Sequence, residues 1–276
     1  MRQVLSVIIP ASNEAGYIGA CLSALFASPL PPGGAEAVVV ANGCRDDTAD
    51  RARALAARAE AAGWGLTVLD LPQGGKPSAL NAGDAVARGG MRAYLDADVL
   101  VSPALIGQLV EVLATPAPRY ASGTAHIPQA QSRVTRAYAR FWQTLPFAQS
   151  VAPGYGLFAV NAAGRARWGE FPAIISDDTF VRLQFLPAER VQVAAPYDWP
   201  MIEGFAALTR VRRRQDAGVA EIARLWPGLL AREGRARLGL GGLAARALRD
   251  PLGFATYAAV SLAVRARRGN GWTRGR

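Results

Sequence analysis

Short apolar strands alternate with helical segments along the first hundred residues, and this alternation constrains the fold more than any other feature. Four short runs of β-branched and other apolar residues predict buried strands at Val4–Ile9, Ala37–Val40, Leu66–Leu71 and Ala93–Leu95. Helical patterns separate them: one opens after Asn13-Glu14, one runs from Asp46 to near Gly63, and one is capped by Ser78 and ends near Arg88. Such alternation favours an α/β fold with a doubly wound, mostly parallel central sheet and flanking helices.

Polar side chains stand directly after three of these predicted strands. Asn13 and Glu14 follow the first strand, Asn42 follows the second, and Asp96 and Asp98 follow the fourth. In an open parallel sheet, ligands bind in the crevice outside the carboxyl ends of the strands. The sequence therefore predicts that these side chains share one ligand-binding crevice.

The pattern changes after residue 115. Further strands are predicted at Tyr120–Ile127, Leu157–Asn161 and Arg190–Ala194, and helices at Gln131–Ser150, from Asp177 onward, and at Glu203–Asp216. Gly154 and Gly156 flank Tyr155 just before the second of these strands. This short aromatic loop is expected to shape the acceptor side of the crevice, with ordinary packing as the alternative.

Two pairs of carboxylates carry the candidate chemistry. Asp96 and Asp98 can hold one hard cation together with phosphate oxygens, although a turn capped by an Asp side chain has the same spacing. A Mn²⁺ or Mg²⁺ ion there would neutralise charge that develops on a leaving diphosphate. Asp177 and Asp178 are adjacent, so that their repulsion can raise one pKa and prepare a carboxylate to accept a proton from an alcohol. Capping of a helix N-terminus is the alternative for this second pair.

Other catalytic arrangements find little support. The chain has one histidine, His126, and two distant cysteines, Cys21 and Cys44, so neither a zinc site nor a disulfide framework is expected. No nucleophile elbow accompanies the histidine. The segment Gly74–Lys76 lacks the glycine spacing and the following hydroxyl of a phosphate-binding P-loop.

Five segments together resemble the motifs of family 2 glycosyltransferases in order and spacing. They are Val7–Glu14, Val38–Thr48, Gly75–Gly83, Tyr94–Asp98 and Ser176–Thr179. Each is weak alone, but five in one order are specific. The resemblance covers about residues 1–216 and implies the GT-A fold, with residues 1–115 as the nucleotide-binding half and 116–216 as the acceptor and catalytic-base half. Residues 217–276 lie outside it and form a basic, helical tail.

The resemblance also implies roles for individual positions in the nucleotide-binding half. The residues that match the loops around a nucleotide sugar are Pro10, Ala11, Asn13, Glu14, Asn42 and Lys76. Asn42 stands where an acidic residue usually contacts the base, so a hydrogen-bonding group is kept and a charge is lost. Asp96 and Asp98 match the motif that holds the metal and the diphosphate, with Asp98 as the direct metal ligand.

In the second half, Asp178 matches the catalytic base of the family. Asp177 replaces the glutamate that usually precedes it, which leaves open which of the two reaches the acceptor. Tyr155, Arg210 and Arg213 are candidates for contacts with the acceptor or the pyrophosphate.

The reaction implied is inverting transfer of one sugar from a nucleoside diphosphate sugar, most simply a UDP-sugar, to an acceptor hydroxyl. The motif Gln-x-x-Arg-Trp of polymerising members and their long membrane spans are absent, so single transfer is favoured over polymerisation. Cell-envelope glycan, glycolipid or polysaccharide synthesis is the expected setting.

Two alternatives remain open at this point. A sugar-phosphate nucleotidyltransferase uses a similar scaffold, but the glycine-rich basic loop expected after the first strand is missing. A nucleic-acid-binding module could use the basic tail, whose aromatic residues are scattered rather than interleaved with the arginines. A nucleic-acid partner is therefore not expected.

The positive charge is concentrated near the C-terminus. Residues 210–276 hold 15 arginines and 4 acidic residues, in a chain with a net charge of +10. Within them, Leu252–Val264 is apolar but shorter than a membrane span, and its flanks carry Arg249, Arg265, Arg267 and Arg268. This pattern favours a helix lying in the plane of an anionic membrane surface, with a helix packed on the protein's own core as the equal alternative. No secretory signal is recognised, so cytoplasmic residence with peripheral attachment to the cytoplasmic face of the membrane is expected.

Overall fold

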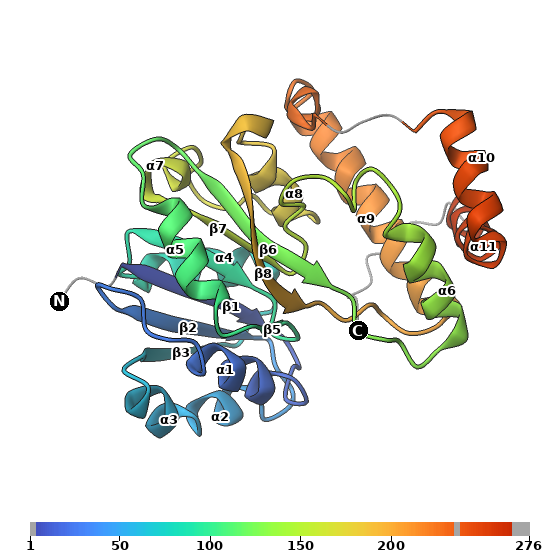
Figure 1. The fold of residues 1–276 in the computed structure, drawn as a ribbon. Helices are drawn as coiled ribbons and strands as arrows, with labels where there is room; N and C mark the ends of the chain where they lie inside the picture. The colour runs from blue at the N-terminus through green and yellow to red at the C-terminus, as the bar shows by residue number, and fades with distance from the viewer. Residues whose placement is uncertain (1–3, 235–237, 267–276) are drawn as a thin grey trace.

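A mixed central sheet with helices on both faces forms the body of the molecule (Figure 1). The computed structural model describes residues 4–234 and 238–266. The strands in these residues are β1 (Leu5–Ala11), β2 (Ala35–Asn42), β3 (Gly65–Leu71), β4 (Met91–Leu95), β5 (Leu100–Val101), β6 (Tyr120–His126), β7 (Leu157–Val160) and β8 (Arg190–Asp198). Their order across the sheet is β3-β2-β1-β4-β7-β6-β8-β5, and β7 and β5 run against the other strands. The predicted α/β fold with a mostly parallel sheet is confirmed.

The helices follow the strands along the chain and cover both faces of the sheet. The α-helices of the described residues are α1 (Ile18–Phe26), α2 (Thr48–Arg53), α3 (Ala56–Ala61), α4 (Lys76–Val86), α5 (Leu105–Leu113), α6 (Arg133–Trp142), α7 (Ala162–Arg165), α8 (Asp177–Arg182), α9 (Phe205–Leu225), α10 (Leu240–Arg249) and α11 (Pro251–Ala266). Short 3₁₀ turns, η1 (Pro187–Glu189) and η2 (Leu229–Arg232), complete them.

Alternation of side chains along the central strands gives the sheet a core on each face. In β1, Leu5, Val7 and Ile9 pack with α1 and α5, whereas Ile8 points to the opposite face and packs with α4 and α8. Successive side chains of a strand point to opposite faces, and strands covered on both sides are apolar throughout. This explains why the first two strands read as continuous apolar runs in the sequence.

The helix predicted from Asp46 to Gly63 is wrong as one element, because it is two short helices, α2 and α3. The chain turns between them at Ala54 and Leu55, and Leu55 packs against the core under α1. Tertiary packing therefore overrides the helix propensity of this alanine-rich stretch.

The predicted cap at Ser78 is also wrong. Helix α4 begins at Lys76, directly after Gly75, and no side chain caps it. Pro77 in the first turn explains the earlier start, since the first N–H groups of a helix have no partner within it and a proline there loses nothing. The start of α4 thus places Lys76 at the edge of the crevice.

Later elements differ from the predicted ones mainly in length. Helix α6 ends at Trp142 rather than at Ser150, β8 continues to Asp198, and α9 continues to Leu225. The domain boundary predicted at residue 216 therefore falls inside a continuous helix. Strand β5, which has two residues at the sheet edge, was not predicted.

The C-terminal helices pack on α6 and α9 at one side of the molecule (Figure 1). Val260 and Val264 of α11 pack with Tyr138 of α6 and Leu208 of α9. One face of α11 therefore packs against the rest of the protein, which is one of the two alternatives given for this helix in the sequence analysis. Arg267 and Arg268, which belong to the same prediction, lie outside the described residues. Among the described helices, none has both the length and the apolar content needed to cross a membrane.

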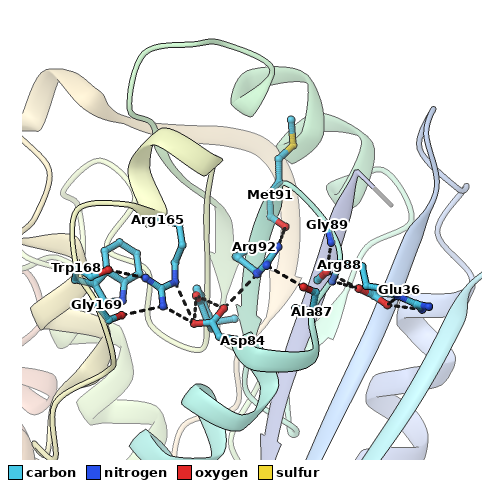
Figure 2. A network of polar contacts seen from close by, with 12 residues as sticks. Glu36, Asp84, Ala87, Arg88, Gly89, Met91, Arg92, Arg165, Trp168 and Gly169 are labelled. Carbon is cyan, nitrogen blue, oxygen red and sulfur yellow. Dashed lines mark hydrogen bonds and ion pairs between the residues drawn. The ribbon is translucent and has the colours of Figure 1, made fainter. Parts of the chain in front are cut away.

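Two acidic side chains, Asp84 and Glu36, join helices and loops to strands of the sheet through hydrogen bonds and ion pairs (Figure 2). Asp84 of α4 forms ion pairs with Arg92 of β4 at 3.2 Å and with Arg165 of α7 at 3.0 Å. Glu36 of β2 is fully buried and accepts hydrogen bonds from Ser6 and from the backbone and guanidinium of Arg88. Burial alone would raise the pKa of the Glu36 carboxyl, but these hydrogen bonds lower it below its usual value. These contacts fix α4 and β4, and with them the positions of Lys76 and Asp96.

Candidate active site

A cavity of about 340 Å³ opens at the carboxyl ends of the central strands. The residues predicted for a nucleotide sugar or a metal that line it are Pro10, Asn13, Glu14, Asn42, Lys76, Asp96 and Asp98. Ala11 does not line the cavity, but its carbonyl accepts a hydrogen bond at 2.9 Å from Asn42, which does. The structure therefore brings these side chains into one crevice, as the parallel-sheet geometry requires.

Asn42, the last residue of β2, links the end of β1 to the segment before α4 at the wall of this cavity. Its side chain is buried, and its amide donates to the carbonyls of Ala11 and Val40. Its carbonyl oxygen accepts a hydrogen bond from the N–H of Gly75 at 2.9 Å. The Asn42 side chain thus positions the segment that carries Lys76, and this role is separate from the contact with a nucleotide base that the resemblance implies.

The loops after β1 and β2 are joined by direct hydrogen bonds. Asn13 adopts a left-handed backbone conformation with φ of 59°, and its side-chain oxygen accepts from the N–H of Arg45 at 2.8 Å. The N–H of Glu14 donates to the hydroxyl of Thr48 at 2.9 Å. Asparagine tolerates this conformation better than most residues, which accounts for its use at this turn. These hydrogen bonds within the protein hold the two loops together.

Lys76 stands between two acidic residues from different parts of the chain. Its ammonium lies 2.9 Å from a carboxylate oxygen of Asp96 and 3.3 Å from one of Asp177. Burial alone would lower the pKa of this ammonium, but Asp177, Asp96 and Asp178 together raise it above its usual value. Lys76 is the only lysine in a chain that otherwise uses arginine. It is therefore a permanent positive charge in the crevice.

Asp177 is almost fully buried, with 4% of its surface exposed. Burial raises the pKa of its carboxyl to about 6, with a further increase from Asp178 and Asp96 and an opposing decrease from Lys76. Within the described residues, this carboxylate has its ion pair with the Lys76 ammonium. Asp177 is thus a buried partner of the lysine.

Asp178 is more exposed than Asp177 and faces a small cavity of about 10 Å³. Pro10, Lys76 and Asp96 line both this space and the larger cavity, so that the two are adjacent. One oxygen of Asp178 accepts a hydrogen bond from the N–H of Thr179 at 2.6 Å. The two predicted carboxylate pairs therefore meet at one place, as the sequence interpretation requires.

Helix α9 holds the segment that carries these two acids. The carboxylate of Glu221 accepts a hydrogen bond from the N–H of Ile175 at 2.9 Å. Gly218 lies so close to Ser176 that a Cβ atom there would fall 2.1 Å from the serine hydroxyl oxygen. The close contact between α9 and the start of α8 thus depends on glycine.

The loop around Tyr155 packs behind the cavity. Gly156 has φ of 75°, and a Cβ atom on it would lie 2.5 Å from the Trp199 ring, so this position requires glycine. Its carbonyl accepts the N–H of Asp96 at 2.8 Å. The Tyr155 ring lies 4.5 Å from Trp199 and 5.4 Å from Trp142, and these two tryptophans line the cavity. Tyr155 thus supports the wall from behind.

The arginines of α9 take different positions from those expected. Arg212 and Arg214 line the cavity, while Arg210 is exposed and Arg213 donates to the carbonyl of Ala263 in α11. The contact of Arg210 and Arg213 with an acceptor or a pyrophosphate stays a prediction, and the structure adds Arg212 and Arg214 as candidates. Residues three or four apart share a helix face, so that Leu208, Val211, Arg212 and Gln215 line the cavity while Arg213 reaches α11.

One wall of the cavity was not predicted. Its side chains are Tyr138, Trp142, Trp199, Met201, Ile202, Leu208 and Val211. They come from α6, from the segment after β8 and from α9, which are distant in the sequence. Trp199 follows β8 directly, but the predicted strand ended at Ala194, so its position did not indicate this wall.

The fold and the cavity define an α/β protein that holds carboxylates and one lysine where open parallel sheets bind nucleotides. The model of the family described as glycosyl transferase family 2 matches residues 6–166, more than half of the chain. The chain therefore belongs to this family and is a glycosyltransferase with the GT-A fold. Among curated protein sequences, none matches it.

Solved structures share the fold at low sequence identity. A mannosyltransferase from Pyrobaculum calidifontis, solved with GDP-Man and Mn²⁺, is 22% identical with a TM-score of 0.62, and the match covers 98% of this chain and 77% of that one. S. aureus TarS 1–349 with UDP-GlcNAc is 14% identical with a TM-score of 0.56, covering 96% and 92%. Glucosyl-3-phosphoglycerate synthase from Mycobacterium tuberculosis, solved with Mn²⁺ and UDP, is 22% identical with a TM-score of 0.52, covering 80% and 79%. These likenesses concern the fold.

Replacing Lys76 by Met should destabilise the protein in a pH-dependent way. Without the ammonium, the pKa of the buried Asp177 carboxyl rises further. A carboxyl whose pKa is higher in the folded than in the unfolded protein binds more protons when folded, so its ionisation opposes folding and stability falls as pH rises. Because the Asp177 pKa is already about 6 in wild type, the deficit relative to wild type should be small near about pH 4.5, grow between about pH 6 and about pH 8, and reach roughly 2 kcal/mol.

Urea unfolding at several pH values, with Lys76→Arg as the charge-keeping control, measures this deficit. An equal deficit at about pH 4.5 and about pH 7.5 would show that lost packing rather than lost charge causes it, since only the charge effect depends on pH.

Proposed function

We propose that this glycosyltransferase moves one sugar from a nucleoside diphosphate sugar, with a UDP-sugar as the first candidate, to an acceptor hydroxyl with inversion at the anomeric carbon. The observation that carries the proposal is the meeting of Asp96, Asp98, Lys76 and the pair Asp177–Asp178 around adjoining cavities. The GT-A fold supplies the setting, and the neighbours bind GDP-Man, UDP-GlcNAc or UDP. Residues 1–216 would form the catalytic domain, with nucleotide-binding and acceptor halves on either side of residue 115.

The residues present fit a Mn²⁺ or Mg²⁺ ion shared with the donor. Asp96 and Asp98 offer hard carboxylate oxygens on the cavity wall. Within the described residues, no group of three His, Cys, Asp or Glu side chains could hold a metal alone. Phosphate oxygens of the donor would therefore complete the coordination. When bound, the ion would neutralise charge on the leaving diphosphate.

Asp178 is the better candidate for the catalytic base of the two acids. Both acids line the small cavity, but Asp177 is buried and paired with the Lys76 ammonium, whereas Asp178 is more exposed. Asp178 would take the proton of the acceptor hydroxyl as the acceptor oxygen forms a bond to C1 of the sugar. The bond from C1 to the diphosphate oxygen breaks, and the nucleoside diphosphate leaves with that electron pair. The charge of Lys76 would stabilise the leaving group.

A metal-dependent donor site predicts a thermal shift that needs the carboxylates. UDP or GDP with Mn²⁺ should raise the melting temperature of wild type by several degrees at about 100-fold excess over Kd, because a ligand that binds the folded state stabilises it. Asp98→Asn should remove most of this shift and keep the protein folded. If Asp98→Asn gives the full shift with Mn²⁺, the metal role of Asp98 is wrong.

The base assignment predicts different results for the two acids. Asp178→Asn should keep the nucleotide-dependent thermal shift and lower turnover by about 10²- to 10⁴-fold, the usual contribution of a general base. Asp177→Asn should lower turnover less and should chiefly alter stability. Nucleoside diphosphate release, measured by a coupled assay, reports turnover and separates this reaction from nucleotidyl transfer, which releases pyrophosphate. Normal turnover in Asp178→Asn with a dead Asp177→Asn would exchange the two roles.

We also propose that α10 and α11 rest on an anionic membrane surface. Leucines cover their outer faces: Leu240 is 86%, Leu248 84%, Leu252 66% and Leu262 64% exposed. Soluble proteins seldom gather so many exposed leucines in one region, and such patches mark interaction surfaces. Arg249 and Arg265 are exposed beside them, and Asp250 is paired with Arg140. Apolar faces with basic flanks fit a lipid surface, as a cell-envelope or glycolipid role would require.

Vesicle flotation tests this surface. Vesicles of phosphatidylglycerol and phosphatidylcholine should carry wild type to the top of a gradient, and the double variant Leu248→Gln/Leu252→Gln should bind at least about tenfold more weakly, because two leucines no longer insert. Leu186→Gln, which changes a leucine that is 53% exposed elsewhere on the molecule, is the matched control. Equal flotation of the double variant and the control would exclude this face.

A further inference from the structure

The cavity has two chemically different ends. Pro10, Asn42, Lys76 and the Asp96–Asp98 segment line one end, where a nucleoside diphosphate sugar and a cation would lie. At the other end, α6, the segment after β8 and α9 contribute mostly apolar side chains, with Tyr138, Arg212, Arg214 and Gln215 beside them; the apolar ones are Trp142, Trp199, Met201, Ile202, Leu208 and Val211. The acceptor must enter beside the donor, so the apolar end is the space that it would occupy.

This apolar wall is held rigidly. The Trp142 and Trp199 rings lie 5.9 Å apart, and Tyr155 packs against both. The hydroxyl of Thr135 donates to the carbonyl of Ile202 at 3.3 Å and accepts from the N–H of Gly204 at 2.8 Å, which fixes the segment after β8 on α6. A pre-formed apolar wall binds an apolar group without an ordering cost.

Two basic side chains stand at the rim of this end. Arg212 is held by Asp216 at 2.9 Å and by the hydroxyls of Tyr138 and Tyr257. Arg214 also lines the cavity, and within the part of the chain that the structure describes it forms no hydrogen bond or ion pair. The rim therefore offers positive charge next to apolar surface, which suits a molecule with both a polar or anionic head and an apolar chain.

The apolar wall is continuous with the packing of the C-terminal helices. Tyr138 and Leu208 line the cavity and also pack with Val260 and Val264 of α11. The same helix carries the exposed Leu252 and Leu262 on its outer face. The apolar wall of the cavity therefore packs directly on the helix that carries the proposed lipid-facing surface.

We infer that the acceptor is an amphiphile, with an alkyl or isoprenoid-like chain that lies in this apolar end and a hydroxyl-bearing head that faces the donor. The inference rests on the proposed glycosyl transfer and names the acceptor class of the same site. Met201, Ile202 and Leu208 already pack with Tyr138 and α11 on one side. A wholly hydrophilic glycan would stack on the two tryptophans but would set polar groups against the cavity-facing surface of these three side chains. The alkyl chain accounts for all five side chains together.

Binding of n-alkyl β-D-glucosides tests this inference, with chains from methyl to hexyl and all below their micelle concentrations. Calorimetry gives the affinity, and because the chain has six tryptophans, the location is reported by the part of the fluorescence change that Trp142→Phe or Trp199→Phe removes. Affinity should rise about fourfold per added methylene, the value for burial of one methylene group. Met201→Gln and Ile202→Asn should each flatten this dependence on chain length, and hexyl glucoside should bind them at least about fivefold more weakly, which corresponds to the loss of roughly one buried methylene or more.

Two controls distinguish a chain in the cavity from a chain on the outer face of α11 and from a loss of folding. Leu252→Gln, on that outer face, should leave the affinity for hexyl glucoside unchanged; if it causes the loss and the cavity variants do not, the chain binds the outer face and the inference is wrong. The nucleotide-dependent thermal shift, measured on every variant, confirms folding.

Equal affinity for methyl and hexyl glucoside would also overturn the inference. If wild type binds the nucleotide but its affinity for alkyl glucosides does not depend on chain length, only this inference is wrong. If wild type does not bind the nucleotide, the proposed function is wrong.

Discussion

The ammonium of Lys76 stands between two carboxylates from different halves of the chain, Asp96 after β4 and Asp177 at the start of α8. Without a cation, the repulsion among Asp96, Asp177 and Asp178 would oppose the approach of these halves. A chain that elsewhere uses only arginine keeps its single lysine here. An ammonium is a compact point charge with freely rotating donors, so it can approach two carboxylates that come from different elements.

The part of the site at the carboxyl ends of the strands could be predicted, because its position follows from the parallel direction of the strands alone. In a parallel sheet, whatever follows each strand lies at the same edge, so Asn13, Asn42 and Asp96 needed only correct strands to be brought together. The apolar wall could not be predicted, because Trp142, Met201 and Leu208 meet through the packing of α6, the segment after β8 and α9. The arginine positions were out of reach for the same reason, since one residue of helical phase separates Arg212, on the cavity wall, from Arg213, which faces α11.

The errors in the predicted elements have related causes. Nothing local marks the turn at Leu55 that divides α2 from α3, because core packing rather than a glycine or proline produces it. The start of α4 could have been read from Pro77, whose place in the first turn outweighs the serine that follows it. A single proline thus decides whether Lys76 lies in a loop or on the first turn of a helix.

Helix α9 joins the separate functions proposed for this molecule. Leu208 and Arg212 belong to the acceptor wall, Arg213 binds the backbone of α11, and Gly218 and Glu221 hold the segment before Asp177. At 1.5 Å per residue, the stretch from Leu208 to Glu221 spans about 20 Å of one continuous rod. A rigid helix transmits displacement along its length better than a loop does. One helix therefore positions the apolar cavity wall, α11 and the segment before Asp177 relative to one another, so that the proposed lipid contact, acceptor site and catalytic base would all depend on α9.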